Sequence, residues 1–273
     1  MKRKSKMKYL IINGSPHKGN TWKLAEMVKT NLLNQDINTE FNEIHMAQLQ
    51  LPFCLGCSNC FRLGRETCPH DDKMSVVIKG IEDADGFIVV STTYNRRETA
   101  LLKNLFDHLC YMLHRPHFFT SKALVITTTG GVGGRAAAKS IASMLQGIGF
   151  NRCYLFSTAS YSWNAYEPRT KTINKLSKIT VKFQKEVASK QLHSPSILQL
   201  IPYNIFRGMS LAYTKGSQYE TEDGRHWTTE ERKKKVYDPS VRVSFYKKPF
   251  GQLFYMIGKK AGKMKRVQVS YKK

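Results

Sequence analysis

Four cysteines in one short segment have the spacing needed to hold an inorganic redox centre. They follow the pattern Cys54-x-x-Cys57-x-x-Cys60, then seven residues, then Cys68-Pro69. Thiolates two residues apart wrap a compact iron–sulfur cubane, which a fourth thiolate completes. Four thiolates, or three together with His70, also suit a tetrahedral zinc ion. Free thiols are the third interpretation, and the spacing alone leaves all three open.

A second stretch, residues 13–21, has the character of an anion site. It reads Asn-Gly-Ser-Pro-His-Lys-Gly-Asn-Thr, between the apolar run Tyr9–Ile12 and a segment with apolar residues at helical spacing. A loop between a strand and a helix offers hydroxyls, backbone N–H groups and the positive end of the helix dipole. We expect Asn20 or Thr21 to cap this helix. The loop has neither the Walker A nor the dinucleotide-binding glycine pattern, which favours a monophosphate.

Two further loops carry small and hydroxyl residues after apolar runs. The run 86–90 leads into Ser91-Thr92-Thr93-Tyr94-Asn95, and the run 123–126 leads into a threonine-rich segment that ends in Gly130-Gly131. Glycine allows a ligand to approach the backbone closely. Both loops therefore suit contact with a bound phosphate or ring.

The elements that position these loops are strand-like and helix-like segments that alternate over the first 190 residues. Such alternation predicts an α/β protein with a parallel sheet covered by helices on both faces. Ligands bind at the carboxyl ends of such strands, so the three loops are expected to converge there. The expected strands are residues 9–13, 39–44, 86–90, 123–126 and 153–156, and the expected helices are 21–34, 72–82, 101–109, 136–146 and 170–188.

The first loop resembles the phosphate loop of the flavodoxin-like NAD(P)H-dependent FMN reductases. That family carries a Gly-Ser-Pro-Arg segment followed by Gly-Asn-Thr after its first strand. The matching residues here are Gly14, Ser15, Pro16, Gly19, Asn20 and Thr21, with His17 in place of the arginine. The resemblance implies a flavodoxin-like, doubly wound, five-stranded parallel sheet of order 2-1-3-4-5 and bound FMN. NAD(P)H is then the implied co-substrate.

The resemblance extends to the second loop, where the family has Ser-Pro-x-Tyr and then Lys-x-x-x-Asp-Arg. Thr92 replaces the proline, which predicts a less rigid loop, and His108 replaces the arginine. No catalytic side chain is expected, because hydride transfer to a flavin requires no acid–base residue. The implied FMN contacts are Ser15, His17, Gly19, Asn20, Thr21, Ser91, Thr92, Thr93, Tyr94, Asn95, Gly130 and Gly131.

The cysteine motif is similar to that of the iron–sulfur flavoproteins, a branch of the same group. This likeness implies a 4Fe-4S cluster on Cys54, Cys57, Cys60 and Cys68. The expected function is an oxidoreductase that passes electrons from NAD(P)H through FMN to an unknown acceptor. The alternative is an electron carrier in which FMN and the cluster exchange electrons with a partner protein. The resemblance also implies a homodimer or homotetramer, and Cys110 is expected to be a buried, inert thiol.

The alternating pattern stops near residue 192, which predicts an FMN-binding domain over 1–192 and a basic extension over 193–273. The whole chain has a net charge of +24, and residues 194–273 hold 17 Lys or Arg against 6 Asp or Glu. An apolar stretch, 250–258, runs into a lysine-rich one, 259–266, as in segments that lie on anionic membranes. An arm packed on its own domain or a neighbouring subunit is the favoured interpretation.

Composition also bears on location and on other partners. The sequence shows no secretory signal and no run of about twenty uncharged apolar residues. We therefore expect a cytoplasmic protein. No specific nucleic-acid partner is expected, because the positive charge is not combined with a nucleic-acid-binding motif.

Overall fold

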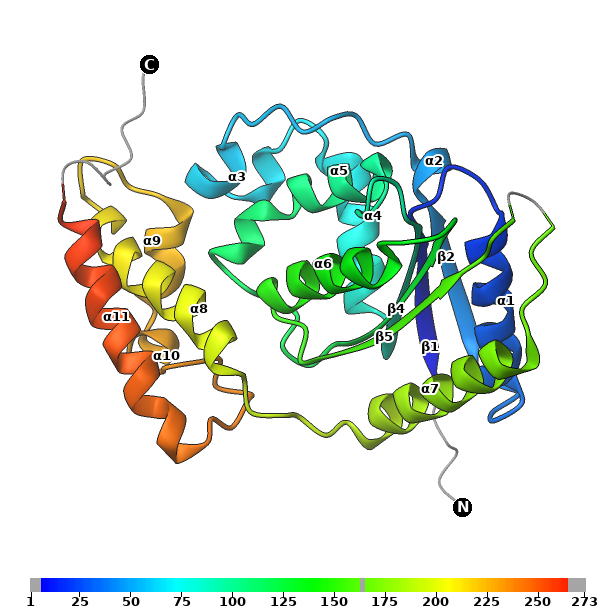
Figure 1. Cartoon of the computed structure of the whole chain (residues 1–273). Helices are drawn as coiled ribbons and strands as arrows, with labels where there is room; N and C mark the ends of the chain where they lie inside the picture. Colours follow the sequence, from blue (N-terminus) through cyan, green and yellow to red (C-terminus); the bar gives the residue numbers. More distant parts are fainter. Residues whose placement is uncertain (1–5, 163–164, 265–273) are drawn as a thin grey trace.

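The chain forms a three-layer α/β sandwich with a helical extension beside it (Figure 1). The structure is a computed structural model that describes residues 6–162 and 165–264. All strand pairings are parallel, and the order is β2-β1-β3-β4-β5. The predicted fold and strand order are therefore confirmed. The strands are β1 (Lys8–Asn13), β2 (Glu40–His45), β3 (Gly86–Thr92), β4 (Lys122–Thr129) and β5 (Arg152–Ala159).

The centre of the sheet is buried on both faces, as its continuous apolar runs require. Strands β3 and β4 are buried almost throughout, whereas β2 and β5 form the partly exposed edges. The β3–β4 register pairs Ser91 with Thr127 and Thr92 with Thr128. The register therefore places threonine hydroxyls of two neighbouring strands at the same edge of the sheet.

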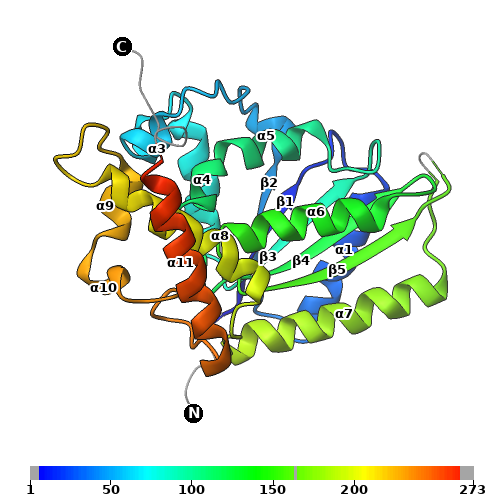
Figure 2. The ribbon, with the colours of Figure 1, turned by 60° about the vertical axis from the view of Figure 1, so that its left-hand side comes forward.

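Helices cover both faces of the sheet (Figures 1 and 2). On one face, α1 (Asn20–Leu33) and α7 (Thr170–Ser189) bury an apolar cluster that includes Val28 and Phe183. On the other face, α4 (Asp71–Glu82), α5 (Ala100–His108) and α6 (Gly134–Gly147) bury a second cluster that includes Leu105 and Ile141. Each of these helices overlaps one predicted from the sequence.

The cysteine segment lies between β2 and α4 and contains only short helical turns. These are α2 (Met46–Leu49), α3 (Asn59–Arg62) and the 3-10 helix η1 (Arg65–Thr67). A further 3-10 turn, η2 (Cys110–Leu113), follows α5. With so little regular hydrogen bonding of its own, this segment depends on side chains of neighbouring elements for its shape.

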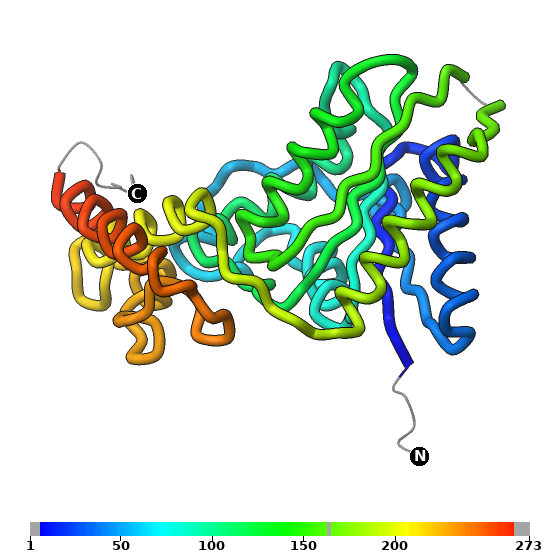
Figure 3. Tube along the Cα trace, turned by 60° about the horizontal axis from the view of Figure 1, so that its bottom comes forward, coloured from blue at the N-terminus to red at the C-terminus, as the bar shows by residue number. Residues whose placement is uncertain are grey.

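The extension folds around a small apolar cluster of its own, to which Phe119 of the preceding part also belongs. Figure 3 shows it at the end of the molecule opposite α1. The division at residues 192 and 193 stays a prediction. Over the described ranges, none of the helices is both long and apolar enough to span a bilayer. The elements of the extension are α8 (Ile197–Met209), η3 (Ser210–Tyr213), α9 (Glu222–Trp227), α10 (Glu230–Lys233), η4 (Phe245–Lys247) and α11 (Lys248–Gly262).

Candidate functional site

Four hydroxyl groups fasten the predicted loops together at the carboxyl edge of the sheet. The Ser15 hydroxyl lies 3.0 Å from that of Thr92, and the Thr21 hydroxyl lies 3.1 Å from the same Thr92 oxygen. Thr21 also shares a hydrogen bond with Thr128 of β4. The backbone adds a bond from the Gly14 N–H to the Val90 carbonyl, at 2.8 Å. The three loops therefore meet at one rim, as the strand order predicted.

Thr92, which departs from the family pattern, is central to this network. Its N–H donates to the Ser15 hydroxyl at 3.0 Å, while its own hydroxyl bonds with Ser15 and Thr21. Proline has neither an N–H nor a hydroxyl, so the family residue makes none of these bonds. The expectation of a less rigid loop stays a prediction, and these hydrogen bonds provide a restraint in place of the proline ring.

The first loop leads into the N-terminus of α1, and its residues on the solvent side do not take part in the hydroxyl network. His17 and Lys18 are exposed, and Gly19, not Asn20 or Thr21, is the N-cap residue of α1. No side chain caps this helix, which corrects the expected cap. The Asn20 amide instead donates to the Ser162 carbonyl at 2.6 Å and so ties the loop after β5 to the rim. The uncapped N-terminus of α1 therefore faces the rim with its backbone donors.

The second loop is a tight hairpin. Tyr94 and Arg97 exchange backbone hydrogen bonds of 3.0 and 2.9 Å across Asn95 and Arg96. These two central residues have φ values of +49° and +65°, as a type I′ turn requires. Tyr94 is about half exposed at the rim. The hairpin thus holds an aromatic ring at the rim.

The side chains of Ser91 and Thr93 in this loop are both buried, and they have different roles. Ser91 is fully buried, and its hydroxyl donates to the Thr92 carbonyl and accepts from the Thr99 N–H, so it shapes the loop. Thr93 donates its N–H to Thr128, but its buried hydroxyl has no hydrogen-bond partner among the described residues. A buried hydroxyl without a partner is costly, so Thr93 has an unmet hydrogen-bonding requirement beside the rim.

The third loop leaves open space beside the rim. Gly130 and Gly131 are exposed, and no atom lies within 4 Å of the position that a Cβ would occupy on either residue. Gly133 differs, since it has a φ of +90° and packs against Arg96. The fold therefore requires glycine at 133, whereas Gly130 and Gly131 leave room for a bound molecule.

The predicted metal ligands also come together, in a separate cavity of about 170 Å³. Cys54, Cys57, Cys60 and Cys68 all line it. Asn104 of α5 holds the entry to the motif, since its amide donates to the carbonyls of Leu51 and Pro52, and its oxygen accepts from the Cys54 N–H at 3.1 Å. Sequence reasoning missed Asn104, although an asparagine inside an apolar helical stretch is a recognisable signal.

Cys110 also lines this cavity, which corrects the expectation of an inert thiol without partners. It lies at the start of η2, only partly buried, and lines the same cavity as Cys60. Interaction with the Cys110 thiol, together with burial, raises the pKa of Cys60, while interaction with Cys60 lowers the pKa of Cys110. The pair therefore loses its protons in two coupled steps. Sequence spacing gave no sign of this contact, because 50 residues separate the two thiols.

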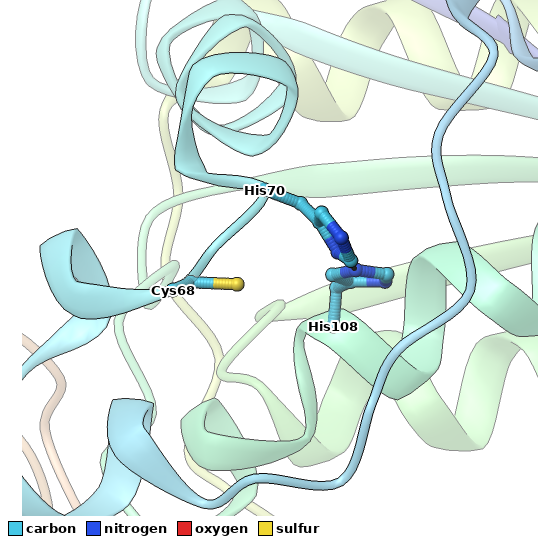
Figure 4. A group of neighbouring side chains, drawn as sticks. All are labelled: Cys68, His70 and His108. Carbon is cyan, nitrogen blue, oxygen red and sulfur yellow. Dashed lines mark hydrogen bonds between the residues drawn. The ribbon is translucent and has the colours of Figure 1, made fainter.

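Two histidines complete the cavity lining (Figure 4). The ligand atoms of Cys68, His70 and His108 lie within 4.8 Å of one another. His108 Nδ1 lies 2.9 Å from the Asn104 carbonyl, and its Nε2 lies 3.1 Å from His70 Nδ1. The carbonyl fixes the proton on His108 Nδ1, so His108 Nε2 accepts from His70. Five thiols and two imidazoles thus suit either a thiolate-bound cluster or a zinc ion.

Helix α5 connects the rim with the cavity. At its N-terminus, Thr99 caps the helix and donates its hydroxyl to the Gly14 carbonyl of the first loop. Asn104 and His108, near its middle and end, contact the cysteine cavity. Nine residues of α-helix span about 14 Å. The two sites therefore belong to one connected structural unit.

The extension contacts the cysteine segment. The buried Arg115 donates to the Cys60 carbonyl at 2.7 Å and to the carboxylate of Asp223 in α9. His114 Nδ1 lies 2.7 Å from the same carboxylate, and the Trp227 indole N–H donates to the His114 carbonyl. An ion pair buried between two segments fixes their relative position.

The sheet order, the position of the rim and the polar loops together define a flavodoxin-like α/β flavoprotein class. The sequence model of the NADPH-dependent FMN reductase family matches residues 7–161, and the chain belongs to that family. The predicted family and the assignment as a flavin oxidoreductase are therefore confirmed.

Individual relatives agree with this assignment. An iron-sulfur flavoprotein of Clostridioides difficile (strain 630) is 28% identical over 195 residues, which cover 71% of this chain and 84% of that protein. An iron-sulfur flavoprotein of Methanocaldococcus jannaschii is 36% identical over 102 residues, or 37% of this chain and 51% of that protein. The predicted likeness to the iron–sulfur flavoprotein branch is thus confirmed.

Solved structures show the same fold. The apo form of an NADH:FMN oxidoreductase matches with a TM-score of 0.50 at 22% identity, covering 69% of this chain and 91% of that one. The NAD(P)H:acceptor oxidoreductase FerB from Paracoccus denitrificans matches with a TM-score of 0.50 at 20% identity, covering 68% of this chain and 100% of that one.

Proposed function

We propose that FMN binds at the rim, with its phosphate at residues 14–21 and its ring beside Tyr94 and Gly130–Gly131. The observation that carries this proposal is the hydroxyl network that fastens the three loops at one edge. The unpartnered Thr93 hydroxyl and the open space at the glycines support it. The remaining members of the proposed site are His17, Asn95, Ser91 and Thr92, the last two holding the loop.

The chemistry of the bound cofactor is hydride acceptance from NAD(P)H and electron transfer onward. The chain's own residues bind and orient it. Backbone N–H groups of the first and second loops provide donors toward phosphate and ring, and the uncapped α1 adds its positive dipole. Exposed Lys18, Arg96, Arg97 and Arg135 supply positive charge that attracts an anionic nucleotide to this edge.

The finer function we propose is transfer of these electrons through a 4Fe-4S cluster on Cys54, Cys57, Cys60 and Cys68. The shared cavity of these thiols supports the proposal, and so do the names of the relatives. Cys110 and the His70–His108 pair line the same cavity, and they would influence the cluster's environment. From the cluster the electrons pass to an acceptor, which is either a small molecule or a partner protein.

The test is an absorbance spectrum of anaerobically purified protein, with iron, sulfide and zinc counts. We expect flavin bands, broad cluster absorbance that dithionite bleaches, and about four irons and four sulfides per chain. Cys57→Ser should lose the cluster bands and keep the flavin bands. Cys153→Ala, which removes a thiol outside the cavity, is the matched control and should keep both. Zinc in place of iron, or no metal at all, would refute the cluster.

The chain is also proposed to form a homodimer or homotetramer. Phe53 and Leu55 of the cysteine segment are large apolar side chains that are mostly exposed. Paired apolar side chains beside a functional cavity are typical of a surface that another protein covers. Light scattering should give a multiple of the chain mass, and Phe53→Ser with Leu55→Ser should reduce it. A monomeric wild-type protein would exclude this assembly.

A further inference from the structure

Helix α11 packs on α8 through its smallest residues. A side chain at Gly258 would collide with the Ile205 carbonyl, and a Cβ on Gly262 would lie 2.8 Å from the Met209 carbonyl. The two helix backbones are therefore in direct contact. Gly251 is also buried on this inner side, although a glycine costs about 1 kcal/mol of helix propensity relative to alanine. The glycines on the inner side are thus explained by the close approach to α8.

The large apolar residues of α11 lie on its outer side. Phe250, Leu253, Met256 and Ile257 are exposed by 43, 52, 61 and 46%, and Phe245 just before the helix by 82%. Their spacing of three and four residues forms one stripe along the helix. Figures 2 and 3 show α11 at the outside of the extension, beyond α8. An ordinary surface helix buries its large apolar residues, whereas this one exposes four of them along one side, as expected of a docking surface.

The charged residues of the segment that carries this stripe are all basic. Residues 239–273 contain ten Lys or Arg and no Asp or Glu. In the part of the chain that the structure describes, the exposed Lys248, Lys259, Lys260 and Lys263 form no ion pair with a carboxylate. Lys265 and Arg266, which continue the run, lie outside the described residues. A two-fold contact between copies would bring these like charges together, which disfavours self-association.

We propose that the outer face of α11 docks on an anionic lipid bilayer surface. We define this face as Phe250, Leu253, Met256 and Ile257 with the four exposed lysines named above. The apolar side chains enter the boundary between headgroups and acyl chains, and the lysines contact lipid phosphates. The glycine-mediated contact with α8 holds the helix as a preformed amphipathic surface. This proposal does not depend on FMN or on the cysteine cavity.

The test is cosedimentation of the full-length protein with vesicles of phosphatidylcholine alone or mixed with phosphatidylglycerol. We expect binding only to the mixed vesicles and a decline in binding as salt rises. Replacing the four lysines by Gln should weaken binding by about a hundredfold or more, since each basic residue near such a surface is worth about fivefold. The double variant Leu253→Gln, Ile257→Gln should also bind the vesicles more weakly. Because the replaced side chains are exposed, both variants should keep the unfolding temperature of the wild type.

The matched control removes the same charge from another helix. Lys171, Lys175, Lys178 and Lys182 are exposed on α7, and their replacement by Gln should leave vesicle binding nearly unchanged. Equal losses in both quadruple variants would show attraction by net charge alone and overturn the assigned face. A lower molecular mass of the Leu253→Gln, Ile257→Gln variant in light scattering would identify the face as a contact between copies and likewise overturn the proposal.

Discussion

At the scale of single residues, Thr92 offers the clearest test of how the rim is held together. Thr92→Val keeps the shape of the side chain but removes a hydroxyl that bonds with Ser15 and Thr21. We expect a loss of about 1–3 kcal/mol in the free energy of unfolding, because the hydroxyls of Ser15 and Thr21 each lose one hydrogen bond. FMN affinity should fall as well, since the loops lose their common anchor.

Urea unfolding and an FMN titration measure these two effects. Thr158→Val on β5 is the matched control, because its hydroxyl makes only long contacts of 3.4 and 3.5 Å. If both variants behave like the wild type, the Thr92 hydroxyl has no part in holding the rim.

His226 gives a prediction about pH. Burial, followed by the charges of Arg232, Arg115 and His117, lowers its pKa from 6.5 to about 3. The unfolded chain takes up a proton near pH 6.5 that the folded chain does not, so stability is lost as the pH falls below that value. The slope is at most about 1.4 kcal/mol per pH unit. His226→Gln should show a shallower fall between pH 7 and 5 in urea unfolding, and identical slopes would contradict this.

Residue types and spacing predicted which cysteines lie close together better than they predicted the contacts of single side chains. The four motif cysteines do share a cavity, but Cys110 and His108 join it, and Asn104 holds its entry, through long-range folding that no local spacing records. The cap of α1 was also predicted wrongly, because the Asn20 amide bonds with Ser162, 142 residues further along the chain. Such contacts depend on tertiary structure, which overrides local preferences.

At the scale of elements, the contact between α9 and the cysteine segment predicts a stabilising role for the extension. Asp223→Asn removes the carboxylate that faces the buried Arg115 and leaves its charge unpaired. We expect a loss of about 3 kcal/mol or more in unfolding free energy. Because Arg115 also holds the Cys60 carbonyl, metal should be released faster to a chelator.

Glu230→Gln on α10 is the control for that variant. Its ion pair with Lys233 is exposed and is worth roughly 0–1 kcal/mol. Equal stability and equal metal release in the two variants would show that α9 does not support the cysteine segment.

The regular elements of the first part were predictable because each carries its own signal. Continuous apolar runs predict covered strands, and apolar spacing of three and four predicts the flanking helices. The extension was not predictable in the same way. Its small core joins Leu200, Tyr203, Trp227 and Tyr237 to Phe119 across about 80 to 120 positions, and no sequence period reports such contacts.

At the scale of the whole molecule, two groups of basic residues belong to the two proposed sites. Cations at the rim would suit the phosphate of a nucleotide, and lysines beside the α11 face would suit lipid phosphates. The extension was expected to pack on its own domain or a neighbouring subunit. It does pack on its own domain through α8 and α9, while the outer side of α11 stays uncovered.

The most direct test of the central claim is a titration of the flavin-free protein with FMN, followed by quenching of flavin fluorescence. We predict saturation at one FMN per chain, and loss of binding when Asn20 and Thr21 are both replaced by Leu in a variant that circular dichroism shows to be folded. A wild-type protein that leaves flavin fluorescence unchanged, or a folded double variant with undiminished affinity, would contradict an FMN site at the rim.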